Sequence, residues 1–351
     1  MTTSAVVVYG FMVAIAISRV PKPLVYKFVI VPIMWGVYIS ALVSAFEITW
    51  WYVPGIEPIY KAVVSLVRPG FPHLDFWGRL TSVGFEPHAL GLWLGFALPV
   101  ALWGLSNKAY QPFRGFWPMG LAFVALMLVL SDGRAGIITS SVVFVVWVTI
   151  KLWPKLYPGV YYPARSAVTV VALLFFSVLA FQLLEGNSLG NELVGGNISN
   201  LSRYAMNVSA YEMVPEAPIA GRGMGQYAFW SDQYIPPWGW NSYEVRGWLI
   251  DAKNGWPSTF SLPGRLLSEL GVIGFLVWYV GIYVVLISAI NLIYRRLKNK
   301  SSSFVELILL LTPFLFFSGL ANETFAQMGF WVAVALCLIG LSNTGEGFRE
   351  K

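Results

Sequence analysis

Apolar stretches of bilayer length recur along the whole sequence, and they restrict the possible folds more than any other feature. A transmembrane helix needs about 20 consecutive, mainly apolar residues. Only 11% of the 351 residues are charged, against about 25% in soluble domains. We therefore expect an all-α polytopic membrane protein with about nine transmembrane helices. The predicted spans lie near residues 3–18, 28–46, 89–106, 115–131, 135–150, 166–184, 266–290, 303–321 and 328–342.

The basic residues predict the orientation of these spans, because Lys and Arg are retained in short cytoplasmic loops. One alternate set of loops carries most of them, at Arg19, Lys22, Lys27, Lys108, Arg114, Lys151, Lys155, Arg165, Arg295, Arg296, Lys298, Lys300, Arg349 and Lys351. The N-terminus would then lie outside and the C-terminus inside. Because this arrangement is unusual, we expect that an N-terminal helix is absent or miscounted. The net charge of +6 reflects this topology, so we expect no nucleic-acid partner.

The other loops are expected outside, at residues 47–88, 131–134, 185–265 and 322–327. We expect one helical membrane domain over residues 1–351, with residues 185–265 as a large extracytoplasmic loop within it. Most acidic residues lie in or beside the outer loops, so any chemistry is expected to face outward. ATP and nucleotide sugars are not expected there, so an enzyme would use an activated donor carried in the membrane. The single cysteine, Cys337, lies in the last apolar run, which excludes disulfides and cysteine-based metal sites.

Two short outer stretches place charged residues beside predicted spans. In "GRLTSVGFEPHALGLWLG", residues 78–95, Arg79, Glu86 and His88 precede a span, and in "LSDGRAG" a tight turn directs Arg134 to the outer surface. Charges at membrane depth usually face a cavity or a partner. A simpler interpretation is that Arg79 and Arg134 reach the interface with their long chains, while Glu86 and the following proline begin a helix. Both interpretations stay open.

The long outer loop carries an arginine, a glycine pattern and many aromatic residues. Arg203 lies on a predicted amphipathic helix, followed by glycines at 221, 223 and 225. No strand precedes them and no Lys-Ser/Thr follows, so they are not a nucleotide-binding loop. A turn whose backbone N–H groups approach a ligand stays open. The aromatic residues that follow, among them Trp230, Trp238 and Trp240, suit stacking on sugar rings and equally suit a membrane-interface belt.

Arg265 and Glu269 lie four residues apart in "WPSTFSLPGRLLSELGVIGF", residues 256–275, so they share one helix face. An exposed pair of this spacing contributes only about 0.3–0.5 kcal/mol. Arginine also presents a planar fork that matches phosphate oxygens. We therefore predict that Arg265 binds phosphate and that Glu269 either holds the fork or acts as a base.

Five stretches together resemble the Wzy-type O-antigen polymerases of the O-antigen ligase and polymerase superfamily. They are the stretch "GRLTSVGFEPHALGLWL", with His88 where the family has Ser, the hairpin "LSDGRAGII", Arg203 followed by "PIAGRGMGQY", the entry "WPSTFSLPGRLLSELGVIGF", and the closing "NETFAQMGFWVAVAL". They lie in the family's order between residue 78 and about residue 337. In the related ligases the stretch that corresponds to residues 256–275 begins with a His that matters for activity, whereas this chain has Phe260 at about that position.

The resemblance implies a membrane fold like that of GT-C glycosyltransferases, in the plasma (inner) membrane, with an extracytoplasmic active face. It implies polymerisation of undecaprenyl-diphosphate-linked oligosaccharide units into surface polysaccharide, such as lipopolysaccharide or exopolysaccharide, without metal or cofactor. The donor and acceptor glycans and the lipid bilayer are the implied partners, and a chain-length regulator is a further candidate. A ligase that transfers the glycan to another acceptor and a membrane transporter are the alternatives.

The residues predicted for this reaction fall into two sets. The catalytic set is Arg265, Glu269, Arg203 and Glu86. Its arginines would stabilise the charge that develops on a diphosphate leaving group, and its carboxylates would orient or deprotonate the acceptor hydroxyl. The substrate-binding set is Arg79, Arg134, His88, Trp230, Trp238 and Trp240.

Overall fold

The computed structural model describes residues 3–67, 78–84, 86–106, 112–131, 133–156, 198–250, 257–296, 303–319 and 327–342. All regular elements within these residues are helical, which confirms the predicted all-α class. The chain divides into two compact units, each described here by itself. Unit 1 comprises Met1–Met12, Val170–Val285 and Gly319–Met328, and unit 2 comprises Val13–Thr169, Leu286–Ser318 and Gly329–Lys351.

Eight of the nine predicted spans lie on described helices, and the ninth, residues 166–184, lies outside the described residues. Three helical stretches are long and apolar enough to cross a membrane, namely Lys22–Tyr52, Pro87–Ser106 and Leu262–Val284, and several apolar helices are shorter. The helices that carry the spans are α1 (Thr3–Ser18), α2 (Lys22–Val25), the π-helix η1 (Tyr26–Ile30), α3 (Val31–Tyr52), α5 (Pro87–Ser106), α6 (Phe116–Ser131), α7 (Arg134–Leu156), α12 (Leu262–Arg296), α13 (Ser303–Phe317) and α14 (Met328–Ser342).

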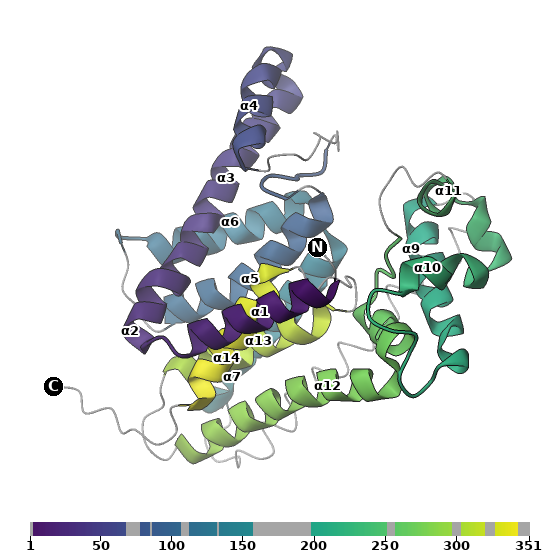
Figure 1. Cartoon of the computed structure of the whole chain (residues 1–351). Helices are drawn as coiled ribbons and strands as arrows, with labels where there is room; N and C mark the ends of the chain where they lie inside the picture. The colour runs from purple at the N-terminus through teal and green to yellow at the C-terminus, as the bar shows by residue number, and fades with distance from the viewer. Residues whose placement is uncertain are drawn as a thin grey trace. The chain divides into compact units, whose positions relative to one another are not determined.

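Helix α5 lies at the centre of unit 2. It packs against α3, α6, α7 and α13 (Figure 1), and it is buried along most of its length. This agrees with its sequence, which is apolar on all sides. The crossing with α7 depends on glycine, because a Cβ atom on Gly136 would lie 2.3 Å from the carbonyl oxygen of Gly91. Such small residues let two helix backbones approach closely within a membrane.

Contacts at the two ends of unit 2 agree with the predicted alternation of loops. At one end, Lys151 pairs with Glu306 at 2.8 Å, and the Trp147 indole donates to Ser106 Oγ at 2.8 Å. Both contacts join helix ends that were expected in the cytoplasm. At the opposite end, Leu80 N donates to the carbonyl oxygen of Leu130 at 3.0 Å. Which end faces the cytoplasm stays a prediction.

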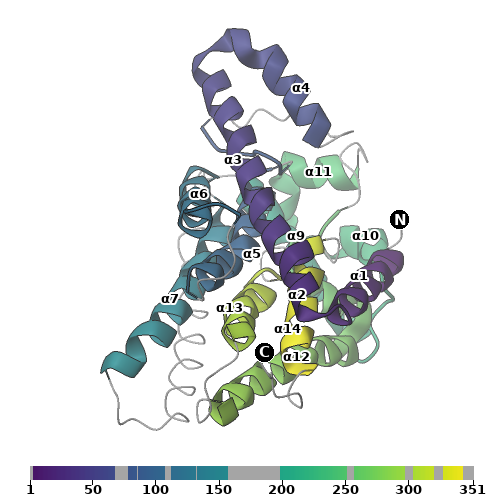
Figure 2. The ribbon, with the colours of Figure 1, turned by 90° about the vertical axis from the view of Figure 1, so that its left-hand side faces the viewer.

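A helix that the sequence did not predict follows α3. The turn η2 (Pro54–Ile56) leads into α4 (Glu57–Val67), which folds back beside the end of α3 (Figure 2). The Trp50 and Tyr60 rings stack at 5.1 Å, and Tyr60 and Val64 are buried against Val43. Two helices joined by a short turn therefore extend the predicted outer end of unit 2.

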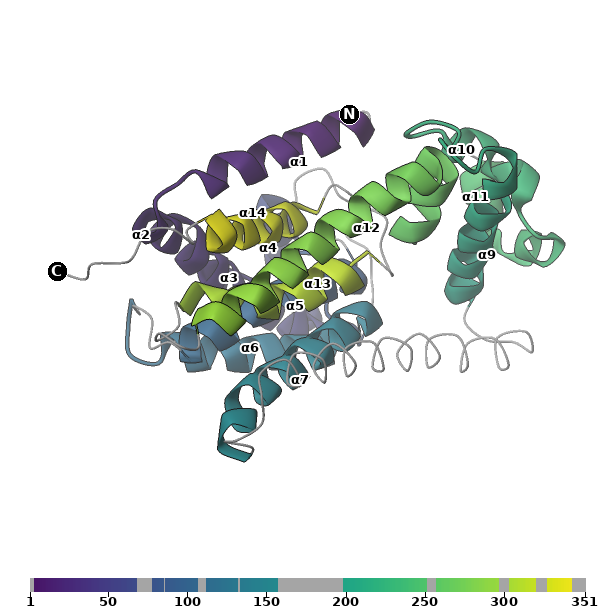
Figure 3. The same cartoon turned by 90° about the horizontal axis from the view of Figure 1, so that it is seen from below.

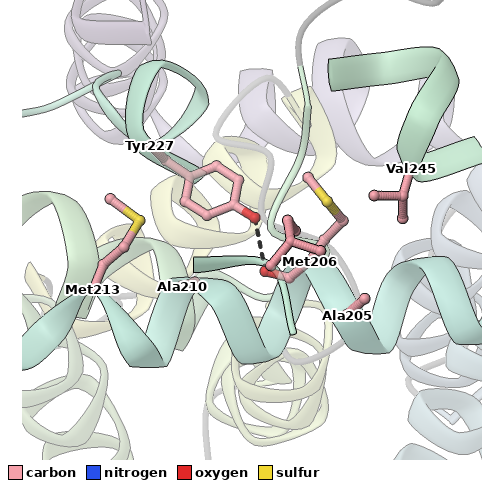
Figure 4. Packing of buried hydrophobic residues seen from close by; sticks show 7 residues of the cluster. Ala205, Met206, Ala210, Met213, Tyr227 and Val245 are labelled. Carbon is pink, nitrogen blue, oxygen red and sulfur yellow. Dashed lines mark hydrogen bonds between the residues drawn. The ribbon is translucent and has the colours of Figure 1, made fainter. Parts of the chain in front are cut away.

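Short helices of unit 1 surround a small hydrophobic core. They are α9 (Ile198–Glu212), η3 (Val214–Glu216), α10 (Tyr227–Trp230), η4 (Ser231–Tyr234), η5 (Pro237–Asn241) and α11 (Tyr243–Leu249). The core consists of Ala205, Met206, Ala210, Met213, Tyr227, Ile235 and Val245 (Figure 4). The Tyr227 hydroxyl donates to the carbonyl oxygen of Met206 at 2.7 Å, which ties α10 to α9. Figure 3 shows α9, α10 and α11 at the end where α12 begins. The helix predicted around Arg203 is confirmed as α9.

Candidate active site

Helix α12 is broken near its start, and the break organises the candidate site. Gly271 has φ 64° and ψ −168°, a conformation that is almost restricted to glycine. It separates a short first part, 262–270, from a long second part, 272–296. Such a break leaves carbonyl groups of the first part and N–H groups of the second part without partners inside the helix.

Residues 217–225, here called the glycine segment, supply these partners. Four backbone hydrogen bonds join the segment to the two sides of the break: Arg222 N to Ser268 O (3.0 Å), Gly223 N to Glu269 O (2.8 Å), Val272 N to Pro218 O (2.8 Å) and Ile273 N to Ile219 O (3.2 Å). From the sequence alone, the backbone N–H groups of the glycine segment could have approached a ligand. Two of them instead bind carbonyl oxygens of α12, so the glycine segment acts as a splint across the broken helix.

Two glycines make this close contact possible. Gly221 has φ 67°, and a Cβ atom there would lie 2.2 Å from the carbonyl carbon of Glu269. A Cβ atom on Gly271 would lie 2.3 Å from the carbonyl oxygen of Ile219. Real Cβ atoms do not approach backbone atoms so closely, and both positions have left-handed φ angles that favour glycine.

The carboxylate of Glu269 connects the glycine segment to Arg265. Glu269 is only 2% exposed. Its Oε2 accepts from Gly225 N at 2.8 Å and from Arg265 Nε at 3.2 Å, and its Oε1 accepts from Tyr227 N at 3.1 Å. An ionised carboxylate can only accept hydrogen bonds, and here both oxygens do so from protein N–H groups. These contacts favour the holding role among the two roles predicted for Glu269.

The two predicted catalytic arginines of unit 1 lie at the junction of α9 and α12. Arg265 has a side chain that is 15% exposed, and its Nε is fixed by Glu269. The Arg203 guanidinium lies over the Phe260 ring at 5.2 Å. One turn further along α9, Asn207 Oδ1 lies 3.0 Å from the place of a Cβ atom on Gly264, the residue before Arg265. The junction thus carries both cations.

Phe260 itself has a conformation that is unusual for a bulky residue. Its φ is 52°, which is uncommon outside glycine and asparagine. The Trp248 ring lies 5.4 Å from the Phe260 ring, and the Arg203 guanidinium lies over the latter. Phe260 therefore packs between a cation and a second aromatic ring, at the position where the resemblance places the His of the ligases.

The three predicted substrate-binding tryptophans have different surroundings. Trp230 is 38% exposed and carries the Arg222 guanidinium at 4.5 Å from its ring. Trp238 stacks at 5.3 Å on Tyr204, the residue that follows Arg203. Both Trp238 and Trp240 pack against the unit 1 core. These contacts account for the packing of Trp238 and Trp240, while contact of all three with sugar stays a prediction.

The remaining predicted site residues lie at one end of unit 2. Arg79 is exposed in a turn, Glu86 directly precedes α5, His88 lies in the first turn of α5, and Arg134 begins α7. The starts of α5 and α7 are close together, because a Cβ atom on Gly133 would lie 3.0 Å from the carbonyl oxygen of Pro87. The side chain of Arg134 lies outside the described part of the chain. The backbone thus gathers these four positions, and their roles stay predictions.

Two charged residues with specific contacts were missed in the sequence. Arg222 binds Glu216 and donates to the Tyr234 hydroxyl at 2.6 Å. Glu47 is buried near the end of α3 and is 2% exposed. An acidic residue at the end of an apolar run is a recognisable signal, so Glu47 could have been found. Among the described residues, no group of three or more His, Cys, Asp and Glu could hold a metal ion.

Comparison with known families gives a match over the middle of the chain. Residues 119–279 match the family described as O-Antigen ligase. The chain contains an O-antigen ligase family domain. This domain includes Arg134, Arg203, the glycine segment, Arg265 and Glu269, whereas Arg79, Glu86 and His88 precede it. A search of curated proteins found no match, and a search of solved structures found none either.

The O-antigen ligase family domain confirms the resemblance seen in the sequence. Together with the repeated apolar helices, it indicates an integral membrane protein. Members of the family are membrane glycosyltransferases that act as ligases or polymerases on lipid-linked glycans. The coarse function is thus polysaccharide transfer of the O-antigen ligase and polymerase type.

Proposed function

We propose that this protein polymerises undecaprenyl-diphosphate-linked oligosaccharide units into surface polysaccharide at the outer face of the plasma membrane. The observation that carries the proposal is the fixed position of Arg265, whose Nε is held by the buried Glu269. A guanidinium held at Nε keeps Nη1 and Nη2 in a defined plane. That geometry suits two parallel hydrogen bonds to diphosphate oxygens.

In the proposed reaction, the acceptor hydroxyl oxygen attacks the anomeric carbon of the donor sugar. The bond from that carbon to the diphosphate oxygen breaks, and undecaprenyl diphosphate leaves with the electron pair. Arg265 and Arg203 stabilise the negative charge that develops on this leaving group, which is a large contribution when donors are preorganised. The proton of the acceptor hydroxyl is released to water as the glycosidic bond forms, and a role of Glu86 as the base stays a prediction from the sequence.

Glu269 then serves as a positioning residue. Its three N–H donors come from Arg265, Gly225 and Tyr227, so its charge is used to hold the fork and the glycine segment. Arg79, Arg134 and His88 are proposed to contact the glycan or the diphosphate. Trp230, Trp238 and Trp240 are proposed to contact sugar rings, which stack on aromatic side chains.

Phe260 favours a polymerase over a ligase. In the ligases that this chain resembles, the stretch that leads into the helix corresponding to α12 begins with a His that matters for activity. In this chain the phenylalanine ring packs between Arg203 and Trp248 and has no group that accepts or donates a proton. A ligase reaction would therefore lack the residue on which those enzymes depend.

The test is polymerisation by the purified protein in lipid vesicles that contain the undecaprenyl-diphosphate-linked repeat unit as the only glycan. A ladder of products, each longer by one unit, is expected. Product that forms only after a separate acceptor is added would support the ligase, and movement of intact donor across the bilayer without a new glycosidic bond would support a transporter. Either result would refute the proposal.

Variants of the arginines assign the roles within this assay. Arg203→Ala is expected to lower turnover by about 100-fold to 1000-fold, as removal of one preorganised donor does elsewhere. Arg246→Ala is the matched control, because Arg246 is an exposed arginine of the same unit whose side chain bonds the carbonyl oxygen of Trp240. Equal activity of the Arg203 and Arg246 variants would remove Arg203 from the site.

A further inference from the structure

Glu47 of α3 is a second buried carboxylate, and it is not among the predicted site residues. It is 2% exposed and accepts from Thr81 N at 2.9 Å, Thr81 Oγ1 at 2.7 Å and Ser82 N at 2.6 Å. A buried charge is costly unless it is hydrogen-bonded. The carboxylate therefore fixes the place of its three neutral donors.

The donors belong to residues 80–84, here called the entry segment. Ser82 has φ 47°, and its hydroxyl donates to the carbonyl oxygen of Ser40 at 2.6 Å. Leu80, Thr81 and Ser82 are buried, and Leu80 N donates to the carbonyl oxygen of Leu130. Strained backbone of this kind persists only where its surroundings fix it. Contacts from α3 and α6 do so here.

The entry segment lies directly against the first turn of α5. A Cβ atom on Gly84 would lie 2.8 Å from Leu90 N and 3.1 Å from the carbonyl oxygen of Glu86. Arg79 precedes the segment and Glu86 follows it. A displacement of Thr81 and Ser82 would therefore displace two of the predicted site residues of unit 2.

We propose that Glu47 is a positioning residue for the glycosyl transfer, because it fixes the entry segment that sets the places of Arg79 and Glu86. This proposal rests on the proposed function. Glu47 does not itself touch the substrate in this proposal. It acts through the backbone N–H groups of Thr81 and Ser82, as Glu269 acts in unit 1 through Gly225 and Tyr227.

Glu47→Gln tests the proposal with little change of shape. One carboxylate oxygen becomes an NH₂ group, so one backbone N–H of the entry segment would face a donor instead of an acceptor. Misplacement of a catalytic group by about 1 Å can cost roughly 100-fold in rate. We expect a fall in kcat of about 10-fold to 100-fold, with the KM for the lipid-linked donor little changed.

Stability is controlled with Gly104→Ala in the same unit. A Cβ atom there would lie 2.2 Å from the buried Trp117 ring, so this variant disturbs α5–α6 packing away from the entry segment. Both variants are assayed at equal amounts of folded protein in vesicles. A kcat of Glu47→Gln that equals that of Gly104→Ala would overturn the positioning role.

A double variant gives the second readout. If Glu47 acts through Glu86, then Glu47→Gln combined with Glu86→Gln should lose little more activity than Glu86→Gln alone. Fully multiplicative losses would contradict this route. Failure of the proposed function is recognised separately, because the unmodified protein would then form no ladder from the lipid-linked repeat unit.

Discussion

Replacing Gly271 with alanine should separate the two parts of α12 from the glycine segment. The backbone at Gly271 has φ 64° and ψ −168°, and alanine in such a region costs about 1–3 kcal/mol. The new Cβ atom would lie 2.3 Å from the carbonyl oxygen of Ile219, so the glycine segment must move away. Two hydrogen bonds to Val272 N and Ile273 N are then lost, at about 0.5–1.5 kcal/mol each.

These contributions together give a destabilisation of about 2–6 kcal/mol. The predicted result is a fall of several degrees in the Tm of the detergent-solubilised protein. Limited digestion with trypsin reports the local change, because Arg222 lies in the glycine segment with its backbone N–H bonded to Ser268. We expect faster cleavage after Arg222 in the variant.

Gly281→Ala is the matched control on the same helix. No atom lies within 4 Å of a Cβ atom built on Gly281, and alanine is better than glycine in a helix by about 0.5–1 kcal/mol. This variant should keep or slightly raise the Tm and should keep the trypsin pattern of the unmodified protein. If Gly271→Ala gave the same Tm and the same cleavage rate as Gly281→Ala, the splint would not contribute to stability.

Three further predictions concern the cation, the helix crossing and the orientation. Arg265→Lys should lose most polymerisation although the charge is kept, because lysine is a point charge without a planar fork; normal ladders from a normal amount of protein would show that Arg265 only pairs with Glu269. Gly136→Ala should cost about 1–3 kcal/mol by overpacking against Gly91, measured as a lower Tm than that of Gly55→Ala, for which the added Cβ atom meets nothing within 4 Å; equal Tm values would contradict the close crossing. With Cys337 replaced by alanine, a cysteine at the exposed Asp232 should react with a membrane-impermeant thiol reagent added outside, and one at the exposed Pro112 should not; the opposite pattern would reverse the orientation.

Much of the helical architecture could be predicted, because apolar periodicity and length depend on local sequence. The segments predicted at 89–106 and 115–131 coincide closely with α5 and α6. The helix α4 was missed because its 11 residues are too few to span a membrane. Its stability depends on the stacking of Tyr60 on Trp50, a contact that the sequence pattern does not reveal.

The contacts of the candidate site were harder to predict. The pairing of Arg265 with Glu269 followed from their spacing along one helix. The break at Gly271 did not, because "LSELGVIGF" is as apolar as an unbroken span, and only a partner distant in sequence makes the break stable. The glycine pattern indicates a turn near some ligand, whereas the partner of this turn is α12 itself.

The splint across the break also sets an order of assembly. The glycine segment is synthesised before Ser268 and Gly271, so its hydrogen-bond partners do not exist while α9 and α10 leave the ribosome. The core around Met206 and Tyr227 contains only residues that precede α12, so it is complete before α12 is made. The hydrogen bonds between the glycine segment and the two parts of α12 can form only after the segment from α9 to α11 has reached the same side of the membrane as the start of α12. Placement of that segment on this side of the membrane is therefore a condition for finishing the insertion of α12.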